Sequence, residues 1–144
     1  MATSGVGVDK GVVDEVTKMQ LKRHAAYLIF AIDESGRVVI DARGGKGATY
    51  DEFCAALPAS APRFAVYDLA FENSDGCKMS KLVFFAWSPE GAPMRAKMLY
   101  ASTKATLVEA LSGAVQVTLQ ATDSDDLDLK AVLPKCSTAG ARVR

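Results

Sequence analysis

Residues 87–113 read WSPEGAPMRAKMLYASTKATLVEALSG, and this stretch holds a long helical pattern around which the other elements can be placed. Two prolines precede the pattern, and proline fits the first turn of a helix, where a missing N–H group is tolerated. Gly113 suits the position that follows the last helical turn. The stretch therefore predicts a helix over residues 93–112.

This helix carries two apolar stripes, which are offset by more than a quarter turn at about 100° per residue. The first stripe comprises Met94, Met98, Ala101, Ala105 and Val108, and the second comprises Ala96, Tyr100, Leu107 and Leu111. Arg95, Lys97 and Lys104 argue against burial of the helix on all sides. We therefore expect one side to pack on the core and another side to stay open for a partner.

The composition indicates one domain with a real core, because 49% of the 144 residues are apolar. We expect this domain to span residues 8–136, between a flexible N-terminal arm at 1–7 and a flexible C-terminal tail at 137–144. The 17 basic and 17 acidic residues cancel. No general field therefore attracts nucleic acid or an anionic membrane.

The cysteines and the hydropathy pattern point to the cytoplasm. The three cysteines are odd in number, and their spacing fits neither a disulfide framework nor a zinc site, so we expect a reducing compartment and no metal. No apolar run approaches the ~20 residues that a membrane span needs, and residues 1–7 lack the features of a signal peptide. We expect no membrane span.

Hydrophobic spacing predicts four helices and five strands in the order αββαββαβα. The expected helices are 8–23, 50–57, 93–112 and a final helix that follows 122–126 and ends at Pro134; the expected strands are 27–32, 37–41, 63–71, 81–87 and 114–121. We interpret 44–47 as a mobile connection and 72–80 as a polar hairpin loop. Two antiparallel hairpins joined in parallel give an α/β fold, a three-layer sandwich in which helices cover both faces of a mixed sheet of about five strands.

The sequence offers little for catalysis. His24 is the single histidine, and at the boundary of a helix and a strand such a residue is typical of surface or packing positions. Cys54 lies in a short apolar helix and is expected in the core. No nucleophile with its base, no phosphate loop at 44–47 and no calcium loop at 122–126 can be completed. We therefore expect neither an enzyme nor a cofactor.

Several segments together resemble the actin-depolymerising factor/cofilin family in order and spacing. They are Ser4-Gly5-Val6, Tyr50-Asp51-Glu52-Phe53, Ala65-Val66-Tyr67-Asp68, 81–85, 87–89, 92–98 and 100–104. The resemblance implies the ADF-homology (gelsolin-like) fold, a monomeric protein of the cytoskeleton, binding to actin monomers and filament sides, and filament depolymerisation. An alternative is a relative of the coactosin or drebrin type, which binds filaments without depolymerising them. A small-molecule enzyme on the same scaffold is a further alternative.

The resemblance also implies which residues act. For actin monomers these are Ser4, Gly5, Val6, Met94, Arg95, Lys97, Met98 and Lys104; for filaments they are Lys78, Lys81 and Lys135. Ser4 would be an inhibitory phosphorylation site. Met79 and the pair Pro134-Lys135 depart from the more basic family pattern, so we expect weak filament severing. Val108 and Glu109 replace basic residues, so we expect phosphoinositides to bind only weakly.

Overall fold

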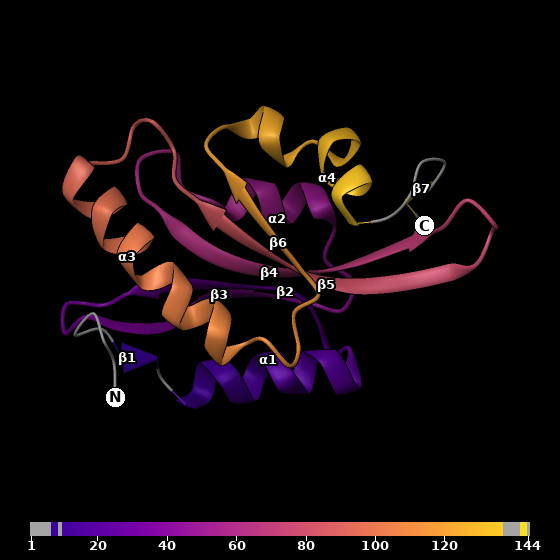
Figure 1. Cartoon of the computed structure of the whole chain (residues 1–144), viewed down its shortest axis with the longest axis horizontal. Coiled ribbons are helices and arrows are strands. Elements are labelled where there is room, and N and C mark those ends of the chain that lie inside the picture. Colours follow the sequence, from indigo (N-terminus) through magenta and orange to yellow (C-terminus); the bar gives the residue numbers. More distant parts are fainter. Residues whose placement is uncertain (1–6, 9, 137–141, 144) are drawn as a thin grey trace.

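A mixed β-sheet forms the centre of the molecule in the computed structural model, which describes residues 7–8, 10–136 and 142–143 (Figure 1). The strand order is β1-β3-β2-β4-β5-β6, and β7 pairs with β4. The strands are β1 (Gly7–Val8), β2 (Ala25–Ile32), β3 (Arg37–Gly45), β4 (Arg63–Glu72), β5 (Lys78–Trp87), β6 (Val117–Ala121) and β7 (Arg142–Val143). The five longer strands confirm the expected mixed sheet; β1 and β7 add two residues each.

The strand directions show how the two hairpins join. β2 pairs antiparallel with both β3 and β4, so β3 and β4 run parallel to each other with β2 between them. β4 and β5 form the second antiparallel hairpin, and β5 pairs in parallel with β6. The connection through the long helix therefore joins neighbouring strands, whereas the connection through the short second helix passes over β2.

Helices cover both faces of the sheet, as the sequence predicts. α1 (Lys10–Lys22) and α3 (Met94–Ala110) pack on one face; α2 (Tyr50–Ala56), the 3-10 helix η1 (Ser124–Leu127) and α4 (Leu129–Cys136) pack on the other. Side chains along β4 pack alternately against the helices on the two faces, because successive residues of a strand point to opposite faces. Phe64 and Val66 face α1 and α3, whereas Leu69 and Phe71 face α2 and α4.

The expected mobile connection at 44–47 is wrong for its first two residues. Gly44 and Gly45 belong to β3, where they pair with Tyr27 and Ala25 of β2. The ring of Tyr27 occupies the space that a side chain at position 44 would need. Glycine is therefore required here for close packing on an aromatic ring and not for flexibility.

The expected loop at 72–80 is too long. The ladder between β4 and β5 continues to the pair Glu72 and Lys78, which have opposite charges and lie across from each other. The hairpin loop is therefore only residues 73–77. Its turn is closed by Gly76, at φ 82°, and by the side chain of Asn73, which accepts hydrogen bonds from the backbone N–H groups of Asp75 and Cys77.

The prediction that Pro134 ends the last helix is wrong. Pro134 lies inside α4, which continues to Cys136. Proline removes a single N–H donor from the helical ladder, so only one hydrogen bond is lost. The final turn is stabilised from outside, because the ammonium of Lys81 donates a 2.7 Å hydrogen bond to the carbonyl oxygen of Cys136. The buried side chain of Cys136 adds an apolar contact.

Candidate functional site

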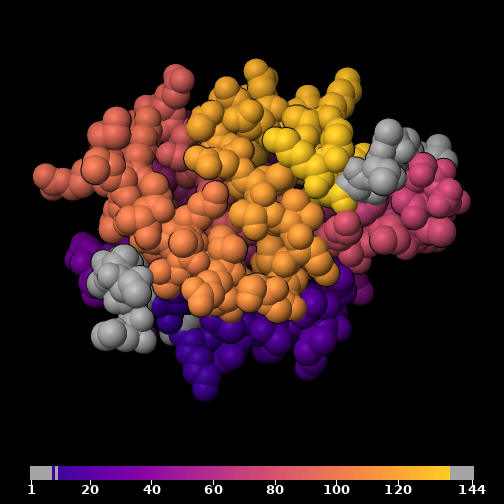
Figure 2. Space-filling view, in the orientation of Figure 1, coloured from indigo at the N-terminus to yellow at the C-terminus, as the bar shows by residue number. Residues whose placement is uncertain are grey.

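The helix α3 lies on the surface of the molecule and packs on the sheet with one side only (Figure 2). Its buried residues are Tyr100, Thr103 and Leu107, whose spacing of three and four places them on one side of a helix. The ring of Tyr100 packs against Phe64 with the ring centroids 5.1 Å apart. The second predicted stripe therefore packs on the core. Val108, which is predicted in the first stripe, also packs against this core and is partly buried.

The opposite side of α3 carries an exposed apolar ridge. We call it the methionine ridge; it consists of Met94, Met98, Ala101 and Ala105, all exposed. The exposed fractions of Met94 and Met98 are 67% and 65%. Leu99, with an exposed fraction of 39%, lies on the same helix, and the spacing does not indicate it because it falls in neither predicted apolar stripe. Exposed apolar side chains gathered in this way are typical of interaction surfaces.

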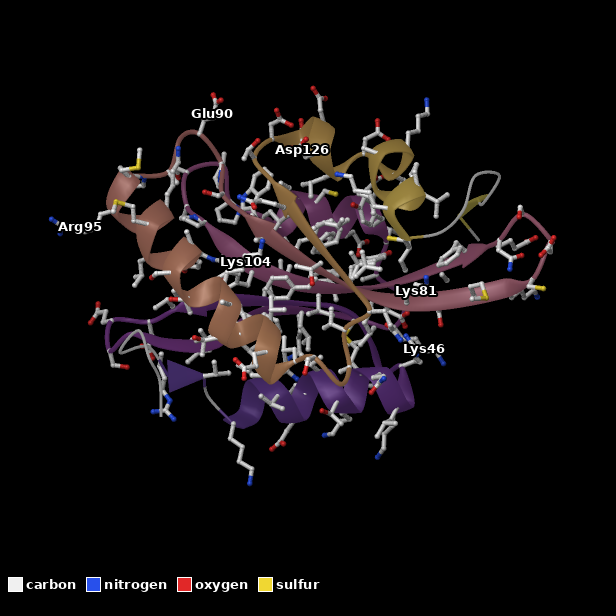
Figure 3. All side chains as sticks on the ribbon, viewed as in Figure 1. Lys46, Lys81, Glu90, Arg95, Lys104 and Asp126 are labelled. Atoms are coloured by element: carbon white, nitrogen blue, oxygen red, sulfur yellow. The ribbon has the colours of Figure 1, made fainter. Side chains whose placement is uncertain are left out.

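Cations flank the methionine ridge on both sides. At about 100° per residue, Arg95 falls on one flank, and Lys97 and Lys104 fall on the other. The side chain of Arg95 points away from the body of the molecule (Figure 3). Lys97 Nζ donates a 3.2 Å hydrogen bond to the carbonyl oxygen of Glu90. Among the described residues, none of these three cations forms an ion pair, so their charges remain available to an acidic partner.

The start of α3 is set by its prolines, as predicted. Pro93 adopts an extended conformation, with φ −60° and ψ 144°, immediately before the helix. Its carbonyl oxygen accepts the first helical hydrogen bond, from the N–H group of Lys97 at 3.0 Å. Pro89 lies one turn earlier and accepts a hydrogen bond from the N–H group of Ala92. These contacts place Met94 and Arg95 in the first turn of the helix.

The first described strand lies beside this helix. β1 pairs in parallel with β3 and contacts α3 (Figure 1). Ser4, Gly5 and Val6, which the family resemblance implies at the same surface, precede β1 and lie outside the described residues. Their assignment stays a prediction, but the position of β1 shows that the chain enters the domain next to α3.

The three residues assigned to filament binding have different environments. Lys78, at the start of β5, and Lys135, near the end of α4, are exposed. Lys81 is half-buried; its ammonium bonds the Cys136 carbonyl oxygen and lies 6.0 Å from the centre of the Phe71 ring. The structure thus ties Lys81 to the end of α4 and leaves Lys78 and Lys135 accessible.

The candidate catalytic residues Cys54 and His24 have different surroundings in the structure. No group of His, Cys, Asp and Glu side chains among the described residues could hold a metal ion. Burial raises the pKa of the Cys54 thiol and so disfavours the thiolate that a nucleophile needs. His24 Nε2 lies 3.8 Å from Glu15 Oε1, in a surface cluster that also contains Arg43.

None of the helices described is long and apolar enough to span a membrane.

Comparison with known proteins gives matches along most of the chain. Residues 5–137 match the family described as cofilin/tropomyosin-type actin-binding proteins. An actin-depolymerizing factor of Vitis vinifera is 42% identical over 132 residues, which cover 91% of this chain and 92% of the relative. Actophorin of Entamoeba histolytica is 39% identical, with 88% of this chain and 94% of the relative covered.

The fold is shared with solved structures of the same kind. The crystal structure of Streptomyces griseoflavus cofilin superposes with a TM-score of 0.84 at 34% identity, and the match covers 92% of this chain and 98% of that one. The family match, the identity to relatives and the common fold agree with one another over the whole domain. The chain therefore belongs to the ADF/cofilin family of actin-binding proteins.

Proposed function

We propose that this protein binds actin monomers and filament sides through the exposed side of α3 and promotes filament depolymerisation. The observation that carries the proposal is the methionine ridge, an exposed apolar surface with cations on both flanks that form no ion pair with another described residue. Family membership supports it, because the relatives are named for cofilin and actin-depolymerizing activity. The protein would act by binding, not by catalysis.

The geometry suits a protein-binding surface. Methionine side chains are flexible and polarisable, so Met94 and Met98 can adapt to an apolar cleft. Arg95 and Lys97 can pair with carboxylates around such a cleft and orient the helix in it. Because the buried side of α3 is already fixed by Tyr100, binding requires little further ordering of the backbone.

A second surface would add contacts specific to filaments. We assign it to the exposed cations Lys78 and Lys135, which come from the β4–β5 hairpin and from α4. Met79 is 37% exposed and contributes no charge at a position next to Lys78. This surface is therefore only weakly basic, and we propose that the protein destabilises filaments while severing them weakly.

We further propose that the protein acts as a monomer in the cytoplasmic cytoskeleton and binds phosphoinositides weakly.

The decisive experiment compares wild type with Arg95→Ala/Lys97→Ala for binding to actin monomers and for the actin left in the pellet after centrifugation. The double variant should lose monomer binding and depolymerisation while its thermal unfolding is unchanged. Lys22→Ala/Lys46→Ala removes two exposed lysines away from α3 and should behave as wild type. Equal activity of the Arg95→Ala/Lys97→Ala variant and wild type would contradict the proposal.

The same assays distinguish the coactosin-like alternative. A filament binder without depolymerising activity would pellet with actin, but would leave the amount of pelleted actin unchanged. A depolymerising protein lowers the amount of pelleted actin as its concentration rises. Vigorous severing in filament imaging, at low occupancy of the filament, would overturn the expectation of weak severing.

A further inference from the structure

A groove of about 740 Å³ opens between α2, the β5–α3 connection and η1. Its apolar lining includes Leu57, Trp87 and Leu127, which belong to the core between the sheet and the helices α2 and α4. Cys54 of α2 is half-buried in the same lining. This volume lies in the range of sites that hold a small ligand or a few peptide side chains.

The rim of the groove is acidic. It carries Asp51 from the first turn of α2, Glu90 from the β5–α3 connection, and Asp123 and Asp128 from the two ends of η1. The described residues that line the groove include no Lys, Arg or His. None of the four carboxylates forms an ion pair with another described residue. The side chain of Glu90 points outward from its loop (Figure 3).

Two partly buried hydrogen bonds link the walls of the groove. The indole N–H of Trp87 donates to the carbonyl oxygen of Pro58 at 2.7 Å, which fixes the segment after α2. The hydroxyl of Tyr50 donates to the carbonyl oxygen of Leu127 at 2.7 Å and ties η1 to α2. Because its walls are already linked, a ligand would pay little to order them.

We propose that this groove binds a segment of a partner protein in which aliphatic side chains stand next to lysine or arginine. Aliphatic side chains would fill the space over Leu57 and Trp87, and the neighbouring cations would reach the carboxylates of the rim. An acidic segment would instead bring like charges together at the rim. The inference goes beyond actin binding by α3, because α3 packs on one face of the sheet and the apolar lining of the groove belongs to the core on the other face.

Trp87 provides the measurement, because it is the single tryptophan of the chain and lines the groove. The full chain is titrated with the blocked, tryptophan-free peptide acetyl-Lys-Leu-Leu-Lys-amide, and in parallel with acetyl-Glu-Leu-Leu-Glu-amide. We expect a saturable change in tryptophan emission with the lysine peptide, weakened by added salt because the charges are screened. The glutamate peptide should give no saturable change.

Charge reversal locates the binding. Asp51→Lys/Glu90→Lys should weaken binding of the lysine peptide by roughly tenfold, because two ion pairs are lost and repulsion is added. Asp14→Lys/Glu34→Lys makes the same change in net charge at exposed residues outside the groove and should bind as wild type does. Circular dichroism checks that each variant is folded, and Asp51→Asn/Glu90→Gln replaces the reversal if it is not.

Three results would overturn the proposal: no saturable change with the lysine peptide, an equal response to the glutamate peptide, or undiminished binding by a folded groove variant. The experiment contains no actin. Its failure would therefore leave the proposed function of α3 untouched, and a failure of actin binding would leave the groove untouched.

Discussion

The backbone N–H of Ile32 donates a 2.9 Å hydrogen bond to the hydroxyl oxygen of Tyr100, and this bond joins the end of β2 to the middle of α3. The two residues are 68 positions apart in the sequence. The bond fixes the rotation of α3 about its axis, because Tyr100 must face the sheet. It thereby also fixes which side of the helix, the methionine ridge, faces outward.

Tyr100→Phe should lower the free energy of unfolding by about 1 kcal/mol, because it leaves the N–H of Ile32 without its partner. Urea denaturation at neutral pH measures the loss. Tyr67→Phe is the matched control, since no described residue forms a hydrogen bond with the hydroxyl of the half-buried Tyr67, and it should change stability little. An equal loss in the two variants would show that the bond to Ile32 contributes nothing particular.

Met94→Ser/Met98→Ser should weaken binding to actin monomers by roughly tenfold, because apolar contact at the centre of an interface carries much of its free energy. Stability should be unchanged, since both side chains are about two-thirds exposed. Leu21→Ser removes a large apolar side chain that is 74% exposed on α1, and should leave actin binding as it is. Binding that persists in the double methionine variant would exclude the ridge as the contact.

Lys78→Ala/Lys135→Ala should reduce co-sedimentation with filaments by several-fold and leave monomer binding intact, because each exposed cation adds one weak, solvent-screened contact. Lys81→Met should act differently. It removes the hydrogen bond to Cys136, so the expected effect is a loss of stability near the end of α4. Filament pelleting and urea denaturation of both variants separate the two roles, and a loss of monomer binding in the first variant would argue against distinct surfaces.

Stability should fall as the pH rises above about 9. In the folded chain, burial raises the pKa of the Cys54 and Cys136 thiols and of the Tyr50 and Tyr67 hydroxyls above their ordinary values. Above these values the unfolded chain loses protons that the folded chain keeps, so the free energy of unfolding decreases with pH.

Urea midpoints between pH 7 and 11 measure this decrease, and Cys54→Ala should make it shallower. Cys77→Ala, at an exposed cysteine, should leave the slope as it is in wild type. A slope that is the same in both variants would show that the thiol of Cys54 does not contribute.

Ser4→Glu should weaken monomer binding, because a negative charge next to the proposed acidic-partner surface repels that partner. Ser4 lies outside the described residues, and the prediction rests on the family resemblance and on the entry of the chain beside α3 through β1. Ser74→Glu, in the hairpin loop, places the same charge elsewhere. The proposed switch would be wrong if the two variants bound actin monomers equally well.

The sequence predicts the long helix well because prolines, glycine and spacing all act locally. Its two stripes, however, are both apolar, and spacing alone does not say which one is buried. That choice depends on Ile32 and Phe64, which contact Tyr100 only in the folded chain. Met94 and Met98 are thus found as an open surface only once the sheet is known.

Strand ends and the acidic groove are harder to predict for the same reason. Lys78 continues a strand because Glu72 lies opposite, although the residues around it read as a polar loop. Pro134 stays in its helix because Lys81, from a distant strand, holds the last turn. The groove is formed by α2, the β5–α3 connection and η1 together, and no local sequence pattern in any of the three predicts it.

The contact between Tyr27 and Gly44 links the choice of amino acid at two positions. A methyl group at position 44 would collide with the aromatic ring, so even Gly44→Ala demands a smaller side chain at position 27. Position 44 can therefore vary only together with position 27. A paired change, Tyr27→Leu with Gly44→Ala, should be tolerated better than Gly44→Ala alone, so mutational freedom in this hairpin belongs to the pair.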